Sequence, residues 1–397
     1  NIKLLSRIST KSLDQNRCWP GPDYGPLEVQ RSVLYNGIKV AAAKPLGAEI
    51  SACTIMFQAG SRNEVDNQLG ATHFIRAMSG CTGCGSSAFS KSRVLQQNGG
   101  SITCSSDRQS IAYTLRCPLV VFNDLKPYLL DAACRPCFED WEVNDRKSQI
   151  CDDLHRMPPK QRVLDLLQRA CWGGPLANSI FCEKPRIASM SGNELNCFVS
   201  THYKSNNCTV ASVGISFEDT MKFAESIEYC RDEPPPRTEI MSFPRRGFEY
   251  YDLGLGSDTW IAVGHALVAA ACGVGNMQGG QHVHDRTPMP PLGSMAGGDV
   301  YTQYQAFNIS YYDTGVFGIL AKTSSGCAWK AAVSASEFLI NVGDLTFNQI
   351  EVGRKRLTND VQLNNCKQSI SFIDSITTDE VCYTAKMLAS KCKWSKE

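Results

Sequence analysis

Residues 57–64 read Phe-Gln-Ala-Gly-Ser-Arg-Asn-Glu, and residues 70–77 read Gly-Ala-Thr-His-Phe-Ile-Arg-Ala. The first segment ends an apolar run that begins at Ser51. That run predicts a β-strand, which the pair Ala59-Gly60 stops. The second segment, extended to Met78, predicts a short helix. Together the two segments predict a strand, a polar loop and a helix that carries His73.

The predicted helix has the frame of a zinc-binding helix but lacks most of its chemistry. An inverted zinc-binding helix reads His-x-x-Glu-His, in which two imidazoles on one face bind the metal and the Glu polarises a water molecule. Here His73 holds the first position, Arg76 stands at the Glu position and Ala77 at the second His position. A guanidinium does not act as a general base and repels a dication, and alanine offers no ligand. The sequence therefore predicts a former peptidase with no catalytic residue, metal or cofactor at this helix.

Cysteines are the other abundant candidate ligands. The chain has 19 of them, and two pairs have CxxC spacing, namely Cys81 with Cys84 and Cys134 with Cys137. The two pairs together match a zinc site, and each pair alone matches a redox motif. A cysteine-rich chain also produces this spacing by chance from buried or surface thiols, which is the interpretation that we favour.

Histidines outside the helix offer few further ligands. His282 and His284 form a His-x-His pair in a loop rich in Gly, Pro and Met, and no Cys or Glu lies nearby, which favours a solvated loop. An active metallopeptidase would have to recruit His155 or His265 from elsewhere. Catalytic zinc needs three protein ligands, so we disfavour this class of function.

Composition and length exclude some classes of function. The chain has 397 residues, 43% of them hydrophobic, and a formal net charge of +1. This length accommodates two or three domains, and the near-zero charge gives no overall attraction to nucleic acid. The longest apolar run, residues 260–274, is shorter than the roughly 20 residues that a membrane-spanning helix needs. It predicts instead a buried helix, or a helix after a strand.

Residues 1–27 are predicted to form an N-terminal extension. Lys3, Arg7 and Lys11 precede the first acidic residue, Asp14, with serine, threonine and aliphatic residues between them. That composition is typical of a mitochondrial transit peptide. A solvated basic tail has the same composition and is the alternative.

The remaining pattern predicts an α+β fold with two similar domains of mixed or antiparallel sheet packed with helices. We place the first domain at residues 28–228 and the second at residues 248–397. Between them, residues 229–247 form a linker, because three consecutive prolines exclude regular structure. The expected strands are a hairpin at 33–40 and residues 51–58, 102–105, 110–117, 209–215, 260–263, 304–311 and 318–322. The expected helices are residues 70–78, 93–97, 119–133, 163–171, 266–272, 331–342 and 345–356.

These segments resemble the pitrilysin-type zinc peptidase superfamily and its mitochondrial branch. That branch contains the processing peptidase subunits and the two core proteins of respiratory complex III. Residues 57–64 followed by 70–73 are similar to the signature of the first domain of the family. The segments that are most similar to the second core protein are residues 99–108, 112–115, 141–143, 175–182, 186–187 and 306–318. The similarity is colinear from about residue 28 to about residue 395.

The resemblance implies a lost metal site, because the third family ligand, a Glu, falls near residues 151–153, where this chain has Cys-Asp-Asp. It also implies a non-catalytic structural subunit on the matrix side of the mitochondrial inner membrane, needed for assembly and stability and supporting respiratory electron transport. The implied partners are core protein 1, cytochrome b and other subunits of a dimeric complex III. A supercomplex with complexes I and IV is a further implied association.

An alternative within the same branch is the non-catalytic α subunit of the processing peptidase, which binds presequences. Residues 275–298 match its glycine-rich loop only in part, and Arg76 stands where that subunit usually has Glu. In either case we expect His73 to be a packing residue with a hydrogen-bond partner. We expect Arg76 to be a buried or interfacial charge beside an acid.

Overall fold

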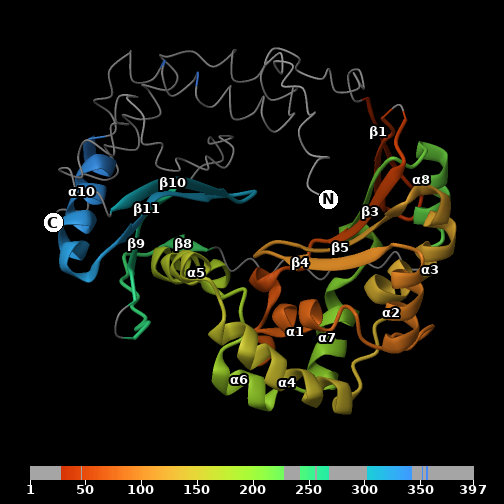
Figure 1. Ribbon diagram of the computed structural model, residues 1–397, viewed down its shortest axis with the longest axis horizontal. Coiled ribbons are helices and arrows are strands. Elements are labelled where there is room, and N and C mark those ends of the chain that lie inside the picture. Colours follow the sequence, from red (N-terminus) through yellow and green to blue (C-terminus); the bar gives the residue numbers. More distant parts are fainter. Residues whose placement is uncertain are drawn as a thin grey trace, which may run out of the picture.

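The computed structural model describes residues 28–45, 47–227, 242–254, 257–267 and 302–341, together with Glu351 and Lys355. It confirms the predicted α+β class, with strands and helices in separate sheet-centred units (Figure 1). The strands are β1 (Val29–Val33), β2 (Lys39–Ala43), β3 (Ile50–Phe57), β4 (Ser101–Ser106), β5 (Ile111–Pro118), β6 (Trp172–Gly173), β7 (Cys208–Val213), β8 (Phe243–Pro244), β9 (Thr259–Leu267), β10 (Gln303–Ser310) and β11 (Gly315–Thr323). The α-helices are α1 (Ala71–Ala77), α2 (Ala88–Gln97), α3 (Phe122–Cys134), α4 (Asp140–His155), α5 (Pro159–Cys171), α6 (Lys184–Ser189), α7 (Gly192–His202), α8 (Phe217–Glu225) and α10 (Ala328–Asn341). Short 3-10 turns are η1 (Ser61–Asn63), η2 (Asp66–Gln68), η3 (Leu119–Val121), η4 (Pro175–Ala177), η5 (Ser205–Asn207) and η6 (Ser325–Cys327).

The first sheet is mixed and six-stranded, in the order β1-β2-β7-β3-β5-β4. Only the β2–β7 pair is parallel. Side chains of β3 and β5 alternate between fully buried and half-buried, because successive residues of a strand point to opposite faces. The buried face carries apolar residues, and helices α1, α3 and α8 pack against strands of this sheet. In Figure 1 these helices lie on the lower and outer side of the sheet.

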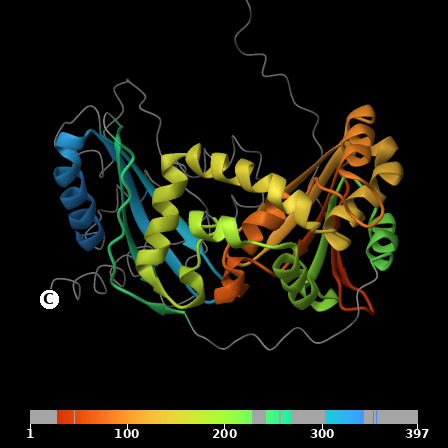
Figure 2. The same cartoon turned by 90° about the horizontal axis from the view of Figure 1, so that it is seen from below.

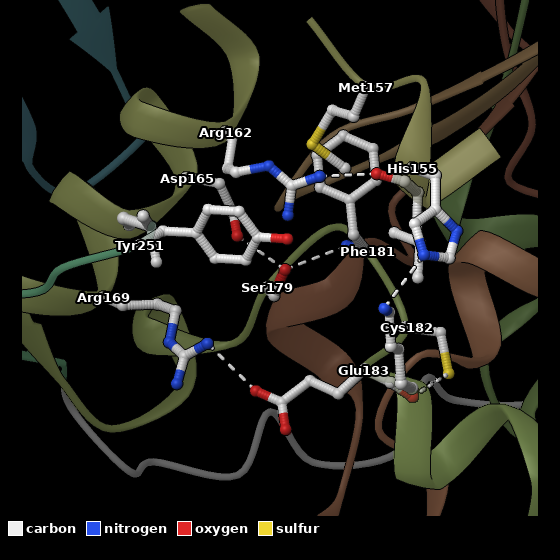
Figure 3. A pocket seen from close by; sticks show the side chains of 13 residues that line it. His155, Met157, Arg162, Asp165, Arg169, Ser179, Phe181, Cys182, Glu183 and Tyr251 are labelled. Atoms are coloured by element: carbon white, nitrogen blue, oxygen red, sulfur yellow. Dashed lines mark hydrogen bonds and ion pairs between the residues drawn. The ribbon is translucent and has the colours of Figure 1, made fainter. Parts of the chain in front are cut away.

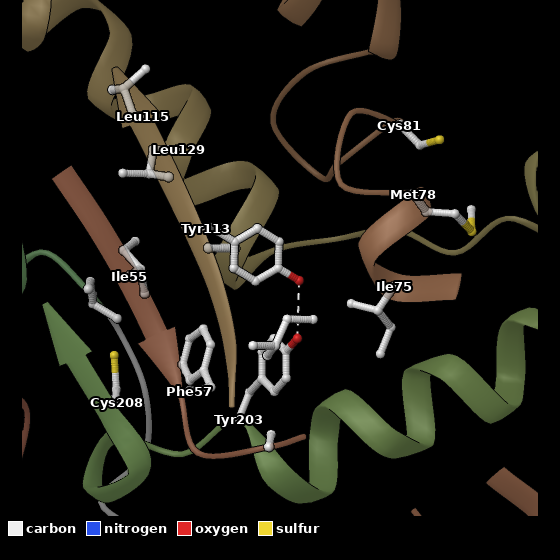
Figure 4. Packing of buried hydrophobic residues seen from close by; sticks show 14 of the residues in the cluster. Ile55, Phe57, Ile75, Met78, Cys81, Tyr113, Leu115, Leu129, Tyr203 and Cys208 are labelled. Atoms are coloured by element: carbon white, nitrogen blue, oxygen red, sulfur yellow. Dashed lines mark hydrogen bonds between the residues drawn. The ribbon is translucent and has the colours of Figure 1, made fainter. Parts of the chain in front are cut away.

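The core between this sheet and its helices fixes the position of α1. The ring of Phe57, at the end of β3, stacks on Tyr203 with the centroids 4.1 Å apart, and the hydroxyls of Tyr203 and Tyr113 lie 3.1 Å apart (Figure 4). Ile75 and Met78 belong to the same buried cluster. Helix α1 follows β3 after a loop that contains η1 and η2, contacts the edge strand β4, and shares its buried core with the central strands.

The second sheet is antiparallel, in the order β10-β11-β9, and both of its faces are covered. Ile319 of β11 packs with Ala335 and Leu339 of α10. Helix α5 lies on the opposite face of the sheet (Figure 2). There Leu167 of α5 joins a cluster with Val316 of β11. Helix α5 lies in the range that we assigned to the first domain, yet it covers the second sheet, and the division at 228–248 stays a prediction.

Most expected elements appear within a few residues of their predicted bounds, with two kinds of difference. The helix expected at 266–272 is wrong at its start, because Ala266 and Leu267 continue β9 and pair with Val316 and Gly315. Helices α4, α6, α7 and α8 were missed, although a capping box at Ser191 and Glu194 marks the start of α7.

Several predictions lie outside the described residues. These are the extension at 1–27, most of the linker, the loop at 275–298 with its His-x-His pair, and most of the helix at 345–356, of which Glu351 and Lys355 are described and are helical. Among the helices that are described, none is both long enough and apolar enough to cross a membrane.

Candidate functional site

Glu64 organises the loop that leads into α1. Its side chain is buried, with 6% exposed, and its carboxylate accepts hydrogen bonds from the amide of Gly70 at 2.8 Å and from the amide and hydroxyl of Thr72 at 2.8 and 2.6 Å. These donors are the free N–H groups at the start of the helix. Burial raises the pKa of Glu64 to about 7, although the three hydrogen bonds act in the opposite direction. The last residue of the 57–64 segment therefore satisfies donors at the start of α1, whose N-cap residue is Gly70.

His73 is buried within α1 and its Nδ1 atom is already engaged. The backbone amide of Cys182 donates a hydrogen bond to Nδ1 at 3.1 Å, and the ring of Phe181 meets the imidazole edge-on, with centroids 5.6 Å apart. Burial, assisted by the charge of Arg76, lowers the pKa of His73 to about 3. The imidazole is therefore neutral at pH 7; because Nδ1 accepts the amide of Cys182, the ring proton is on Nε2, and that nitrogen has no free lone pair for a metal.

Arg76 takes a hydroxyl and an aromatic ring as its neighbours. One guanidinium nitrogen donates to the hydroxyl of Ser106 at 2.8 Å, and the guanidinium carbon lies 5.5 Å from the ring centroid of Phe181. Burial lowers the pKa of Arg76, and the attraction of Asp153 opposes that shift. The acid that we expected beside Arg76 thus acts through space, while Ser106 and Phe181 make the direct contacts. Ala77, the third position of the zinc-helix pattern, is half-buried against the main core, the apolar cluster between the first sheet and its helices.

Helix α4 brings the predicted third-ligand region next to α1. Asp152 and Asp153 are exposed near the C-terminal end of α4, and Cys151 is half-buried against the main core. His155 ends the same helix, and its ring nitrogens face the carbonyl of Cys151 at 2.7 Å and the ammonium of Lys184 at 3.0 Å. The structure thus places residues 151–153 and α1 side by side, as the resemblance implies.

The other predicted ligands lie apart from this helix. His265 belongs to β9, Cys81 and Cys84 lie in the loop after α1, and Cys134 and Cys137 lie at the end of α3 and in the loop after it. Across residues 28–45, 47–227, 242–254, 257–267 and 302–341, no cluster of three or more His, Cys, Asp or Glu side chains is arranged to hold a metal ion.

A pocket of about 200 Å³ opens beside Phe181, and sequence reasoning did not find it (Figure 3). Its wall combines the end of α4, the polar face of α5, residues 179–184 and Tyr251. The lining side chains are Leu154, His155, Met157, Arg162, Asp165, Leu166, Arg169, Ser179, Phe181, Cys182, Glu183, Lys184 and Tyr251. These segments are far apart in the sequence, which drew attention to His155 and to the motif at 175–182 but did not indicate that they meet.

Charged groups of the pocket are mostly paired. Asp165 forms an ion pair with the buried Arg108 at 2.7 Å and accepts a hydrogen bond from the hydroxyl of Ser179 at 2.6 Å. Arg162 lies over the ring of Tyr251, with the guanidinium carbon 4.1 Å from the centroid. Paired charges therefore border much of the pocket, which shares Phe181 with the histidine and arginine of α1.

The sequence of this chain is similar to one family of peptidases and to several mitochondrial proteins. Residues 39–184 match the sequence profile of the insulinase family, peptidase family M16. Human cytochrome b-c1 complex subunit 2 is 27% identical over 348 residues, which cover 84% of this chain and 76% of the human protein. A probable mitochondrial-processing peptidase subunit alpha-1 of Arabidopsis thaliana is 25% identical over 402 residues, or 95% of this chain and 80% of the plant protein.

A third relative extends the comparison. Cytochrome b-c1 complex subunit 1 of Mus musculus is 24% identical over 323 residues, which cover 73% of this chain and 64% of the mouse protein. The matched profile spans β2 to the start of α6, and so includes α1 and its capping loop. Residues 39–184 are thus similar to the insulinase family (peptidase family M16), in a chain that is similar over most of its length to subunit 2 of the cytochrome b-c1 complex.

Proposed function

We propose that this chain is a non-catalytic structural core subunit of mitochondrial ubiquinol–cytochrome c reductase, complex III. It would lie peripherally on the matrix side of the inner membrane, pair with core protein 1 and support cytochrome b in the dimeric complex. In this role it contributes to assembly and stability, and so to respiratory electron transport. A place in a supercomplex with complexes I and IV follows from the same role.

The observation that carries the proposal is the arrangement of α1. The frame of a zinc helix is present, but His73 accepts a backbone amide hydrogen bond at Nδ1, and Arg76 packs on Phe181 where the inverted motif has its general base. The similarity to subunit 2 of the cytochrome b-c1 complex over 84% of the chain supports the same conclusion. Both point to a peptidase fold that is kept as a scaffold.

Blue-native electrophoresis of mitochondria tests the structural role. An antibody against this chain should stain the complex III band, together with core protein 1 and cytochrome b. Depletion of the chain should reduce that band and the ubiquinol–cytochrome c reductase activity in parallel. A chain that migrates only outside the complex III band would overturn the proposal.

Metal analysis of the purified full chain tests the non-catalytic part. We expect less than stoichiometric zinc, and no peptide hydrolysis when zinc is added. Stoichiometric zinc that is removed by a chelator together with a peptidase activity would contradict the proposal.

A second candidate is the α subunit of the mitochondrial processing peptidase. The specific observation in its favour is the Arabidopsis alpha-1 relative, whose similarity covers 95% of this chain. Mixing the chain with an active β subunit and a presequence peptide distinguishes the two candidates. Restored presequence cleavage favours the processing peptidase, whereas incorporation into complex III without such stimulation favours the core subunit.

A further inference from the structure

Two cysteines from different CxxC pairs meet at the surface. Cys84 lies in the loop between α1 and α2, and Cys137 lies in the loop between α3 and α4. Their sulfur atoms are 3.0 Å apart, with Cys84 exposed and Cys137 half-buried. The structure thus pairs one thiol of each motif with a thiol of the other, across 53 residues of sequence. The proposed structural role uses neither side chain.

Backbone contacts hold the two loops against each other. Gly83 and Pro136 form an isolated β-bridge. On either side of it, the amide of Cys84 donates to the carbonyl of Arg135 at 3.0 Å, and the amide of Cys137 donates to the carbonyl of Thr82 at 3.3 Å. Because the backbone of both cysteines is fixed by these bonds, the proximity of their sulfur atoms is built into the loops rather than left to chance encounters.

Two buried carboxylates hold the loop between α1 and α2, which carries Cys84, against the neighbouring helices. Asp131 of α3 accepts hydrogen bonds from the amide of Gly85 at 2.7 Å and the hydroxyl of Ser86 at 2.5 Å, and it forms an ion pair with the buried Lys91 at 3.0 Å. Glu142 of α4 accepts a hydrogen bond from the hydroxyl of Thr82 at 2.7 Å. The loop that carries Cys84 is therefore tied to the helices on both sides of the loop that carries Cys137.

The other two cysteines of the motifs have different surroundings. Cys81 is 4% exposed, and its sulfur accepts a hydrogen bond from the guanidinium of Arg146 at 3.3 Å. Cys134 ends helix α3 and packs against the main core. Burial keeps an oxidant away from a thiol, so Cys84 is the sulfur that solvent reaches first.

We propose that Cys84 and Cys137 form a reversible intramolecular disulfide when the chain meets a low-molecular-weight disulfide such as oxidised glutathione. The thiolate of Cys84 attacks one sulfur of the oxidant, forming a mixed disulfide and releasing one glutathione thiolate. Cys137 then loses its proton to solvent and attacks the Cys84 sulfur, which releases the second glutathione. The protein gives up two electrons and two protons, and one oxidised glutathione becomes two reduced molecules.

The geometry needs little adjustment for this step. A disulfide bond is about 2.05 Å long, so the sulfur atoms approach each other by about 1 Å, a shift that side-chain rotation supplies. The hydrogen bond between the two sulfurs raises the pKa of Cys137 to about 11, so Cys137 keeps its proton while the pair is reduced and gives it up only after Cys84 has been modified. The product joins the α1–α2 loop to the α3–α4 loop.

Thiol mapping of the full-length chain tests the proposal. The reduced protein is incubated in buffers with rising ratios of oxidised to reduced glutathione, alkylated and digested with trypsin. Mass spectrometry should detect a peptide cross-linked between Cys84 and Cys137, which dithiothreitol abolishes. Two alkylatable thiols per chain should be lost in parallel.

Matched variants separate this pairing from disulfides within each motif. Cys84→Ser and Cys137→Ser should abolish the cross-linked peptide, and Cys81→Ser and Cys134→Ser should retain it. A disulfide that joins Cys81 to Cys84 or Cys134 to Cys137 overturns the proposal. So does full alkylation of wild-type Cys84 and Cys137 in the most oxidising buffer, a result that needs no variant to fold.

Discussion

At the scale of single residues, His73 shows how burial converts a metal-ligand position into a packing position. The imidazole lies beneath Phe181, and its Nδ1 atom satisfies the amide of Cys182, which is buried among apolar groups. An unpaired buried amide costs roughly 1–3 kcal/mol, so this hydrogen bond stabilises the contact between α1 and the segment before α6. The sequence predicted a packing role for His73, and the structure supplies its partner.

His73 should also make stability depend on pH. Its pKa is about 3 in the folded chain and near 6.5 when unfolded, so the unfolded chain binds an extra proton in this interval. The contribution of His73 to the free energy of unfolding therefore falls as the pH drops below 6.5, by about 2 kcal/mol at pH 5 relative to pH 8. Urea denaturation at several pH values should show a smaller loss for His73→Asn, which keeps an acceptor for Cys182. Parallel curves for the two proteins would contradict the buried, neutral imidazole.

Glu64 changes the pH dependence of stability in the opposite direction over part of this pH range. Burial raises its pKa in the folded chain, so the folded state holds the proton more tightly and its contribution to stability declines as the pH rises toward 7. The comparison of wild type with His73→Asn isolates the histidine, because Glu64 is present in both proteins.

At the scale of elements, helix α1 depends on a glycine at its start. Gly70 has a φ of +88°, and a Cβ atom there would lie 2.4 Å from the sulfur of Cys182. The tight approach lets the carboxylate of Glu64 reach the first amides of the helix. The sequence motif thus encodes a close contact between α1 and the segment that contains Cys182, in addition to the turn itself.

Gly70→Ala should therefore destabilise the chain by more than the strain of a left-handed backbone alone would. Gly99 is the matched control, because its φ is +64° and a Cβ atom there meets nothing within 4 Å. A left-handed alanine costs roughly 1–2 kcal/mol at either position, and the clash with Cys182 adds about 1–3 kcal/mol at Gly70 only. Urea midpoints of Gly70→Ala and Gly99→Ala measure the difference. Equal losses would mean that Cys182 moves aside without cost.

At the scale of the whole molecule, a pair of side chains joins the loop after β3 to the turn between β10 and β11. Arg62 donates two hydrogen bonds to the carboxylate of Asp313, at 2.9 and 2.6 Å, and its guanidinium carbon lies 4.6 Å from the ring centroid of Tyr312. The pair with Arg62 lowers the pKa of Asp313. The contribution of the Arg62–Asp313 pair to the free energy of unfolding is therefore present above the ordinary carboxyl pKa and is lost on acidification.

Asp313→Asn should loosen both ends of this contact. A bidentate, partly buried pair contributes more than an exposed one, and we expect a loss of about 1–2 kcal/mol. Hydrogen exchange should rise in the η1 loop and in the β10–β11 turn together. The control is Asp258→Asn, which removes the more exposed pair with Lys322 at 2.8 Å and should change exchange within the second sheet only. A rise confined to the β10–β11 turn would mean that the pair does not couple the two regions.

The sequence by itself determined the local elements and the loss of the zinc-helix pattern. Alternation in β3 and β5, the glycine turn before β2 and the frame from 57 to 77 depend on neighbours in the chain, so the pattern predicts them. Helix α4 was missed because its sequence is mostly polar, and its stability comes from tertiary packing of a few apolar residues such as Val143 and Ile150.

Only the tertiary structure decided which distant residues meet. The partner of His73 lies 109 residues away, α5 crosses to cover the second sheet, and Cys84 pairs with Cys137 rather than with Cys81. The pocket beside Phe181 likewise needs α4, α5 and residues 179–184 in place. The physical reason is that residue spacing decides which side chains lie on the same face of one helix or strand. Contacts between different elements depend instead on how their buried faces pack together.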